Sequence, residues 1–438
     1  LRSLVTVRRA WDAHQVRSVL ALCVLLSMSG CFDAHAPDVA DAAPPPRDDG
    51  AAGDVELDAG CVPTREVSRT CDVRWARALG SWRTEWPMHG IAAAQATEDG
   101  TVIASSRTGS IRIDALDADA HGHNTVLVFD ATGRARWARA RTSGVLGTAP
   151  GEAWLRVPDA IGIDLERVTL AGGSTLGTIA VPGWLDDVTV SACASCATTW
   201  IGAVSWNDTI DLGALGAHAA AHGLSLVASD AAGPRWDVTM PVDFDGRFLA
   251  DLVLPPRTAP DGSLVVAWRN RQFVSEGGVF CPLPEACAAP AESVLVAYDA
   301  DGTVRWSRVG TSVQALEMLA DGGFVLSARG LARYDAGGTL RWRVETGALW
   351  NGAIAVDEPG GIVWASLGIA HYPIAVGDAR VGDCGSGLFL HTSVLVRLDL
   401  ETGAFRDVRL PADGLVIETI AILDGGGVVI AGSTGDGA

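Results

Sequence analysis

Short stretches of alternating apolar and polar residues, separated by turns that contain Asp and Gly, run through most of the chain beyond residue 70. Alternation with a period of two is typical of β-strands. In one recurring arrangement, an apolar strand leads through Asp and a Gly-containing turn, most often Asp-x-x-Gly, into a strand carrying Arg and an aromatic residue. The copies cover residues 126–140, 224–238, 294–309, 331–344 and 394–408, and residues 73–77 look like the second half of another. Because Gly tolerates positive φ in the turn, each copy predicts a β-hairpin.

A second hairpin pattern accompanies these copies. It occurs at residues 98–105, 261–268, 321–328, 358–366 and 424–432. Two hairpins per unit predict a four-stranded antiparallel sheet. Several such sheets arranged around an axis form a β-propeller, which leaves only short, protected edges. We therefore predict an all-β protein with propeller architecture.

The order of these patterns predicts the blade count and the closure of the ring. Residues 72–78 form a back half-unit and residues 416–433 a front half-unit, so N- and C-terminal strands together would complete one blade. The other units span residues 90–140, 155–240, 243–310, 311–345 and 346–410, which gives about six blades. The count becomes seven if the long interval between Trp137 and Trp236 hides an extra blade around Val188–Leu212.

The motif itself resembles known repeats. Its Asp-x-x-Gly-x-x-x-Trp core, as in Asp130–Trp137 and Asp299–Trp306, is similar to the quinoprotein-like (PQQ-like) propeller repeat. The longer units resemble repeats of secreted propellers of myxobacterial type, in which an "IDLG" stretch and an "SLV" stretch precede the hairpin, as at residues 209–236. The resemblance covers most of residues 71–438 and implies the fold. It does not imply an activity, because a propeller hosts many functions.

The aromatic residues of the motif recur at one strand position, where a large ring can dock one blade against the next. They are Trp75, Trp137, Trp236, Trp306 and Trp342, with Phe405 in the last copy. A stacked cage for a ligand is the alternative interpretation. The flanking arginines should point to the opposite side, and the turn aspartates should bond local backbone N–H groups. These are Arg74, Arg136, Arg235, Arg305 and Arg341, and Asp130, Asp230, Asp299, Asp335 and Asp399.

The first thirty residues have the pattern of an export signal. Four arginines precede an apolar run at residues 19–26, which is about half the roughly 20 residues that a membrane-spanning helix needs. Residues 28–31 resemble the bacterial lipobox, which implies cleavage before Cys31 and acylation of its thiol; an ordinary signal peptide is the alternative. In bacterial lipoproteins the residue after the acylated cysteine influences sorting between the two membranes. By similarity to them, Phe32 favours localisation of the protein to the outer membrane of a Gram-negative envelope. Residues 31–60, rich in Asp, Ala and Pro, then predict an extended acidic tether, and residues 61–438 the propeller.

Charge and composition narrow the function classes. The chain has 52 acidic against 33 basic residues and a formal net charge of −19, and it contains no lysine. Clustered cations are what phosphate backbones require, so nucleic acid is an unsuitable partner. A hydrophobic fraction of 48% with 19% charged residues excludes a disordered chain.

Seven cysteines remain once Cys23 of the signal and Cys31 are set aside. Short separations suggest the disulfide pairs Cys61–Cys71, Cys193–Cys196 and Cys281–Cys287, which leaves Cys384 over. The Cys193–Cys196 pair could instead be a redox or metal half-site, although no further zinc ligands are evident nearby.

The search for catalytic chemistry finds weak signals only. A quinone-dependent dehydrogenase is the enzyme that the repeat suggests, but such enzymes resemble eight-bladed rings with an adjacent Cys-Cys pair, which this chain lacks. His218 and His222, the His121–His123 loop and Asp243–Asp245 are interpreted as polar loops rather than metal sites. Neither G-x-S-x-G nor a phosphate-binding loop is present. We predict no enzymatic activity, no cofactor and no metal.

These observations predict a lipid-anchored, non-enzymatic β-propeller that serves as a binding or scaffold module at the cell envelope. Its expected partner is a protein or a glycan, and we expect a monomer. The alternative is an outer-membrane protein assembly factor of the propeller lipoprotein type. A dehydrogenase with a quinone cofactor is the third and least favoured hypothesis.

Overall fold

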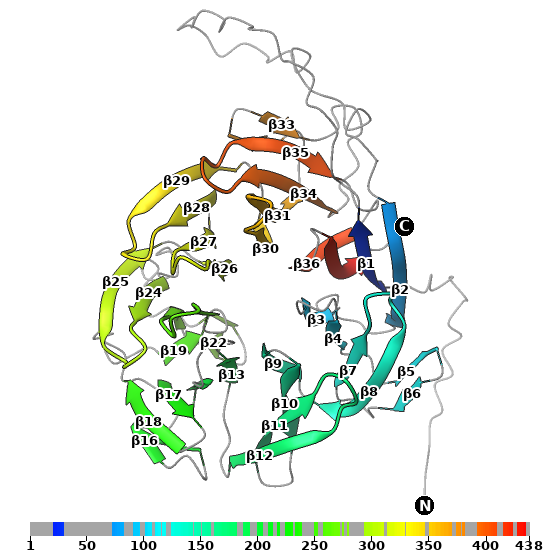
Figure 1. The fold of residues 1–438 in the computed structure, drawn as a ribbon, viewed down its shortest axis with the longest axis vertical. Helices are drawn as coiled ribbons and strands as arrows, with labels where there is room; N and C mark the ends of the chain where they lie inside the picture. Colours follow the sequence, from blue (N-terminus) through cyan, green and yellow to red (C-terminus); the bar gives the residue numbers. More distant parts are fainter. Residues whose placement is uncertain are drawn as a thin grey trace, which may run out of the picture.

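The computed structural model shows a ring of β-sheets around a central opening (Figure 1). All the elements that it describes are strands. The described residues are 21–29, 72–82, 91–96, 101–106, 110–114, 116–119, 124–142, 144–149, 151–158, 162–181, 187–192, 199–204, 209–212, 217–219, 224–230, 233–238, 249–252, 257–271, 274–275, 278–279, 293–310, 313–328, 330–346, 350–369, 374–377, 379–381, 392–409, 415–423 and 427–434.

The ring contains six four-stranded antiparallel sheets and one sheet of five strands. We number these blades along the chain, from the innermost strand of each to the outermost. Blade 1 consists of β3 (Ile91–Ala96), β4 (Val102–Ser106), β7 (Asn124–Phe129) and β8 (Ala135–Thr142), and blade 2 of β9 (Gly144–Ala149), β10 (Glu152–Pro158), β11 (Ile163–Thr169) and β12 (Thr175–Val181). Blade 3 consists of β13 (Asp187–Ala192), β14 (Thr199–Val204), β17 (Leu224–Asp230) and β18 (Gly233–Val238). Blade 4, the five-stranded sheet, consists of β19 (Leu249–Leu252) with β20 (Arg257–Thr258), β21 (Leu264–Arg271), β24 (Ser293–Tyr298) and β25 (Val304–Gly310).

Blades 5 to 7 complete the circle. Blade 5 consists of β26 (Ala315–Met318), β27 (Phe324–Ser327), β28 (Gly330–Tyr334) and β29 (Leu340–Glu345). Blade 6 consists of β30 (Trp350–Asp357), β31 (Ile362–Ile369), β34 (Thr392–Asp399) and β35 (Phe405–Arg409). Blade 7 consists of β36 (Leu415–Ile422), β37 (Val428–Thr434), β1 (Ala21–Ser29) and β2 (Asp72–Trp82). The all-β propeller is confirmed, as are its six four-stranded sheets. The predicted unit 155–240 is divided between blades 2 and 3, so the interval between Trp137 and Trp236 does contain the extra blade.

Blade 7 draws its strands from both ends of the chain, as the half-units predict. Its strand β1 lies between β2 and β37 and comes from the segment that we assign to the export signal, so Cys23 pairs with Ser433. Cleavage before Cys31 would remove β1 from this blade. Signal processing and the tether, residues 31–60, stay predictions, and the tether and Cys31 lie outside the described residues.

The outer hairpins share a local irregularity that sets the direction of their side chains. In blades 1 to 6 the strand register shifts by one residue just beyond the turn, as between Arg333 and Tyr334. Such a bulge increases the local twist and re-aims the side chains that follow. The Asp-x-x-Gly sequence explains the turn, since Gly133, Gly302 and Gly338 have φ of 77°, 87° and 75°.

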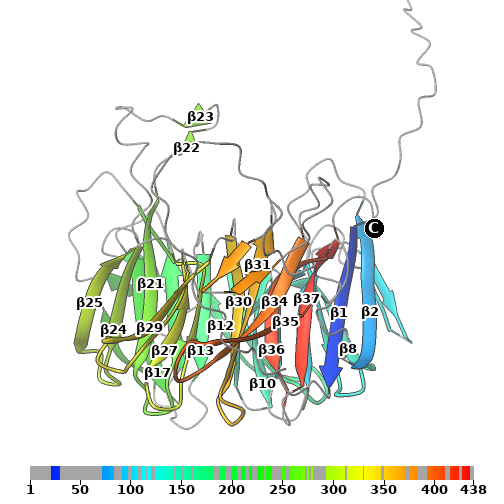
Figure 2. The same ribbon diagram turned by 90° about the horizontal axis from the view of Figure 1, so that it is seen from above.

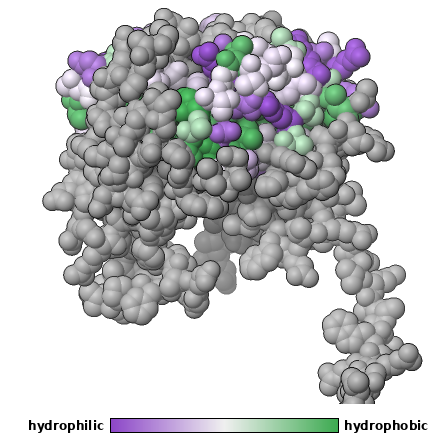
Figure 3. Space-filling view, turned by 90° about the horizontal axis from the view of Figure 1, so that it is seen from below, coloured by the Kyte–Doolittle hydropathy of each residue, from purple (hydrophilic) through white to green (hydrophobic). Residues whose placement is uncertain are grey.

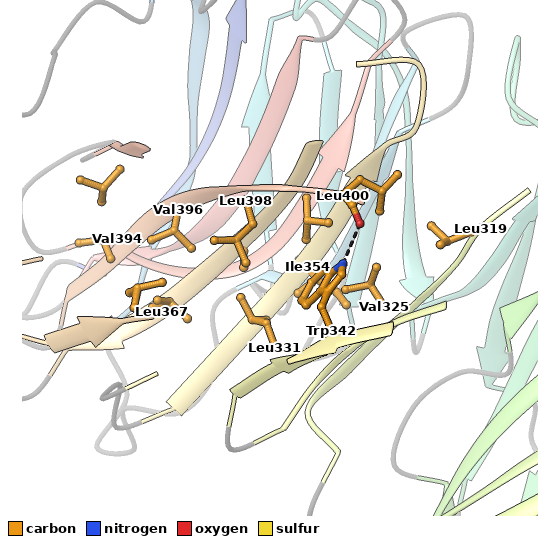
Figure 4. Close-up of a cluster of buried hydrophobic side chains, with 14 residues drawn as sticks. Leu319, Val325, Leu331, Trp342, Ile354, Leu367, Val394, Val396, Leu398 and Leu400 are labelled. Atoms are coloured by element: carbon orange, nitrogen blue, oxygen red, sulfur yellow. Dashed lines mark hydrogen bonds between the residues drawn. The ribbon is translucent and has the colours of Figure 1, made fainter. Parts of the chain in front are cut away.

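The hydrophobic core lies between blades. Figure 4 shows the junction of blades 5 and 6, where Val325 and Leu331 meet Val394 and Leu398. Equivalent clusters join blades 1 and 2, 2 and 3, 4 and 5, 6 and 7, and 7 and 1. Because each strand shows apolar residues to both neighbours, the ring is stabilised by contacts that each blade makes on two sides.

Candidate functional site

Three tryptophans of the repeated motif lie at junctions between consecutive blades. Each indole Nε1 donates a hydrogen bond to a backbone carbonyl of the following blade. The pairs are Trp137 with Leu170 at 2.9 Å, Trp306 with Ala336 at 3.1 Å and Trp342 with Leu400 at 2.8 Å, the last drawn as a dashed line in Figure 4. Trp137 and Trp342 are 9% and 8% exposed. These rings are therefore engaged within the protein and have little surface left to stack on a ligand.

Each of these indoles covers the glycine of the turn in the next blade. Gly173, Gly338 and Gly403 have φ of 68°, 75° and 72°, where a side chain is strained. A Cβ at these glycines would lie 3.0, 2.9 and 2.8 Å from the nearest ring atom of Trp137, Trp306 and Trp342. The turn needs Gly both for its backbone conformation and for the close approach of the ring.

The backbone register places all five motif tryptophans at one position, next to the bulge. Their partners on the neighbouring strand are Ser27, Val128, Ala228, Ala297 and Arg333. The side chains of Trp75 and Trp236 lie outside the described set, so their contacts stay predictions.

Two blades depart from this pattern. In blade 6 the register pairs Arg397 with Asp407 and Leu398 with Phe405, so Asp407 holds the tryptophan position. The expectation that Phe405 occupies this slot is wrong, since Phe405 lies two residues before it. The turn from Asp399 to Gly403 is one residue longer than the turns of blades 1, 4 and 5, and the turn of blade 2 from Thr169 to Gly173 has the same extra residue. In blade 2 the corresponding position is Gly177, opposite Arg167.

An ion-pair cluster stands at the tryptophan position of blade 6. Arg397 donates from Nε to Oδ1 of Asp407 at 2.8 Å and from its terminal nitrogen to Oδ2, and Arg409 donates to the same Oδ2 at 3.0 Å. The guanidinium of Arg397 also lies 5.3 Å from the ring centre of Trp364. At this junction, charge-assisted hydrogen bonds occupy the place that an aromatic ring has elsewhere.

The arginine beside the aromatic position pairs with the aspartate of its own turn. Arg305 Nε lies 2.7 Å from Asp299 Oδ1, and a terminal nitrogen of Arg341 lies 3.0 Å from Asp335 Oδ2. In blade 6, Arg406 makes the same contact with Asp399 at 2.7 Å. This Arg406 hydrogen bond, together with bonds from Thr402, lowers the pKa of Asp399 to about 2. Hydrogen bonds within the turn also lower the pKa of Asp130 and Asp335, so these carboxylates and that of Asp399 stay ionised and serve as acceptors for the turn.

The two faces of the ring differ in what they carry. Strands 1 and 2, and strands 3 and 4, of most blades are joined by tight turns, and we call this side the turn face. The connections between strands 2 and 3 lie on the opposite side, the insertion face, because the strands are antiparallel. Four of these connections contain an extra hairpin. They are β5 (Ser110–Ile113) with β6 (Leu116–Asp119), β15 (Thr209–Asp211) with β16 (Ala217–Ala219), β22 (Val274–Ser275) with β23 (Gly278–Val279), and β32 (Ile374–Val376) with β33 (Ala379–Val381).

The inserted hairpins differ in how they meet the ring. Val376 of β32 is fully buried, and the backbone N–H of Gly377 donates to the carbonyl of Glu345 at 3.1 Å. Asp114 at the tip of β5–β6 has a positive φ of 51° and accepts a hydrogen bond from the N–H of Ala135 at 2.9 Å. The β22–β23 hairpin stands away from the sheets, as Figure 2 shows. It is the inserted element best placed to meet a partner.

A small charged group lies between the innermost strands of blades 4 and 5, near the turn face. Arg257 of β20 lies 3.8 Å from Glu317 of β26, and Glu358 accepts a hydrogen bond from the N–H of Ala320 at 2.8 Å. Burial raises the pKa of Glu317, against the pull of Arg257, and the Glu358 charge adds to the rise. The Glu317 side chain still has 35% of its surface accessible. This arrangement is an ion pair between blades 4 and 5 in which Arg257 only partly offsets the burial of Glu317.

Several residues singled out from the sequence are not located by the structure. Cys31, Cys61, Cys71, Cys193, Cys196, Cys281, Cys287 and Cys384, with His121, His123, His222, Asp243 and Asp245, lie outside the described residues. His218 is in β16, opposite Ile210, with its side chain undescribed. Within the described ranges, no three His, Cys, Asp or Glu residues cluster as metal ligands would. The same part of the chain has no helix with the length and hydrophobicity of a membrane span.

Comparison with known proteins gives likeness of fold alone. No protein-family model matches the sequence. No curated protein sequence matches it either. Among solved structures, BamB from Moraxella catarrhalis is similar over 82% of this chain and 88% of its own, with 14% identity and a TM-score of 0.40. Kuenenia stuttgartiensis hydrazine synthase is similar over 79% and 93%, with 12% identity and a TM-score of 0.43. At such values the likeness supports no inference about function.

Proposed function

We propose that this protein is a non-enzymatic binding or scaffold module, held at the outer membrane by an acylated Cys31. The observation that carries the proposal is the distribution of added structure. Four blades carry an inserted hairpin in the connection between their second and third strands, whereas the Trp, Arg and Asp residues of the described motifs are engaged in junctions and turns. Loops on a rigid scaffold are the usual carriers of recognition.

The β22–β23 hairpin is the element to test first. Replacing residues 274–279 with a short Gly-Ser link should abolish partner capture from detergent-solubilised outer membrane and leave the melting temperature of the ring unchanged. The matched control is the same replacement of residues 374–381, which should lower the melting temperature because Val376 belongs to the core between blades 5 and 6. Capture that persists without β22–β23 would remove this hairpin from the proposal.

The same capture experiment separates the alternatives. A protein or glycan specific to the intact β22–β23 hairpin supports a scaffold. Recovery of the barrel-assembly complex would instead support the alternative, an outer-membrane assembly factor of the propeller lipoprotein type. A quinone bound with calcium, detected by its absorbance after addition of both, would favour the dehydrogenase.

The lipid anchor has its own test. Intact-mass analysis should show a chain that begins at an acylated Cys31 and therefore lacks β1, and Cys31→Ala should release the protein from the membrane fraction. An unchanged membrane fraction for Cys31→Ala would contradict the anchor.

A further inference from the structure

The outermost strand of blade 2 has an unusually open edge. Strand β12 hydrogen-bonds to β11 alone among the described strands. Of its seven residues, Thr175, Leu176, Gly177, Thr178 and Ala180 are all exposed, and Leu176 is 44% exposed. A Cβ added at Gly177 would meet no atom within 4 Å, so the position that holds tryptophan elsewhere is open here. Figure 3 views the ring from the side on which β12 lies in Figure 1.

The chemistry of β12 also differs from that of every other outermost strand. Its sequence, TLGTIAV, contains no charged residue. The outermost strands β2, β8, β18, β25, β29 and β35 each contain at least one arginine. Charged side chains on an edge strand oppose pairing with another sheet, and an uncharged exposed edge permits it.

The sequence of β12 is compatible with antiparallel pairing to itself. A two-fold axis at Thr178 would place Thr178 opposite Thr178 of a second copy, and Leu176 opposite Ala180. Neutral pairs of Thr with Thr and of small apolar residues stabilise antiparallel strands, whereas like charges that face each other destabilise them. Two copies of β29 paired in this way would bring Arg341 and Arg343 of both chains together. Among the described outermost strands, β12 is thus the one suited to a second copy of this chain.

We propose that β12 is a dimer interface, at which two copies pair edge to edge and join their blades 2 into one eight-stranded sheet. The pairing is isologous, with the same strand contributed by both copies. It replaces our expectation of a monomer and does not depend on the proposed scaffold function. Since each chain carries a formal net charge of −19, the two copies repel each other, and salt that screens this repulsion should strengthen the dimer.

Sedimentation velocity of the intact chain in detergent, at rising protein concentration, tests the proposal. We expect a monomer–dimer equilibrium that shifts toward dimer between about 50 mM and about 500 mM NaCl, as the screening length shortens. Thr178→Arg should weaken the dimer at least about tenfold, because the two-fold axis brings the new charges face to face. The fold should tolerate this change, since arginine already stands on the six other outermost strands.

Ser307→Arg is the matched control, because Ser307 is exposed on the outermost strand of blade 4. This variant should dimerise like the unchanged chain. Hydrogen exchange adds a local readout, in which the amides of residues 175–181 that face away from β11 become slower in the dimer and stay fast in Thr178→Arg. A chain that sediments as a monomer at every concentration and salt would overturn the proposal. So would a Thr178→Arg dimer as stable as the original, or a monomer whose β12 pairs only with a strand of another protein.

Discussion

Blades 2 and 5 have the same strand order and the same bulge beyond the outer turn, yet they meet their neighbours differently. Both receive an indole from the preceding blade, Trp137 over Gly173 and Trp306 over Gly338. Four residues beyond that glycine, blade 5 presents Trp342 to blade 6, whereas blade 2 presents Gly177. Receiving a ring and providing one are therefore separate properties of a blade. The turn glycine determines whether a blade can receive a ring from the preceding blade. The residue on the outermost strand determines whether the blade provides a ring to the next one.

This difference has a consequence for the edge of the sheet. In blade 5 the strand that provides the ring also carries Arg341 and Arg343, which keep the edge solvated. In blade 2 the ring and the arginines are both absent from β12, and the strand becomes neutral and exposed. Blade 2 still packs against blade 3 through its hydrophobic core, but its outermost strand provides no ring, so the edge of that strand is open to another contact.

The largest effect in this comparison should come from removing the ring that blade 5 provides. Trp342→Ala empties a buried site and deletes the hydrogen bond to Leu400, which should cost about 3–5 kcal/mol in the free energy of unfolding. Urea titration followed by circular dichroism measures it. Trp342→Phe retains most of the packing and should cost about 1–2 kcal/mol. A loss below 1 kcal/mol for Trp342→Ala would show that the junction does not depend on its ring.

A pair of glycine substitutions tests the two properties separately. Gly403→Ala places a Cβ 2.8 Å from Trp342 at a φ of 72°, and it should destabilise the protein by about 1–3 kcal/mol. Gly177→Ala meets open space within a strand and should be neutral or stabilise by about 0.5 kcal/mol. Thermal melting of both variants checks the contrast. Equal losses would mean that blade 2 is packed at this point like the others.

The ion pair between blades 1 and 2 should give a smaller effect. Glu166 of β11 lies 2.8 Å from Arg139 of β8 and is 9% exposed, and it also accepts a hydrogen bond from Thr175. Glu166→Gln should cost about 1 kcal/mol in urea unfolding. The exposed pair of Arg167 and Glu152, at 3.5 Å, is the control, and Glu152→Gln should cost less than about 0.5 kcal/mol. Similar losses for both variants would contradict a role for burial.

The smallest expected effect is a difference in pH response between the two kinds of turn. Asp399 in the turn of blade 6 has a pKa of about 2, below its ordinary value of 3.8. A lowered folded-state pKa adds stability above pH 4, and this contribution is lost as the pH falls toward 2. Because the carboxylate is partly exposed, the loss should stay below about 1 kcal/mol.

The control is Asp399→Asn, whose unfolding free energy should not show this component between pH 4 and pH 2. The turn of blade 2 has Thr169 at the equivalent place, where its hydroxyl accepts the N–H of Ser174 at 3.1 Å. That turn contains no group that titrates in this range. A fall in stability equal in Asp399→Asn and in the original chain would assign the acid sensitivity to other carboxylates.

The sequence predicts the blades that carry the full motif, because alternation and the Asp-x-x-Gly turn are local properties. Blade 2 is not predicted as a separate blade, because it lacks two residues of the motif. Its turn, Leu170–Gly173, has no aspartate before it, and Gly177 stands where the other blades have an aromatic ring. The Ala171-Gly172-Gly173 run between two alternating stretches is the signal that could have located it. The misplacement of Phe405 has a related cause, because the turn from Asp399 to Gly403 contains one more residue than Asp-x-x-Gly and moves the register of the strand that follows.

The candidate site was predictable only in outline. The sequence indicates units of variable length, but not that the inserted hairpins all join the second and third strands of a blade, because this depends on the order of the strands in each sheet. The exposure of β12 also depends on which strand lies outermost, and no local pattern shows that.

The construction of blade 7 has a consequence for biosynthesis. Its strands β36 and β37 follow all the other described strands along the chain, so the ring cannot close before synthesis has passed them. Until then the apolar faces of blades 6 and 1, which pack against Ile430 and Val429 in the finished ring, have no cover. Pairings between residues so distant along the chain form slowly. The nascent protein should therefore need a chaperone that shields these two faces until the ring closes.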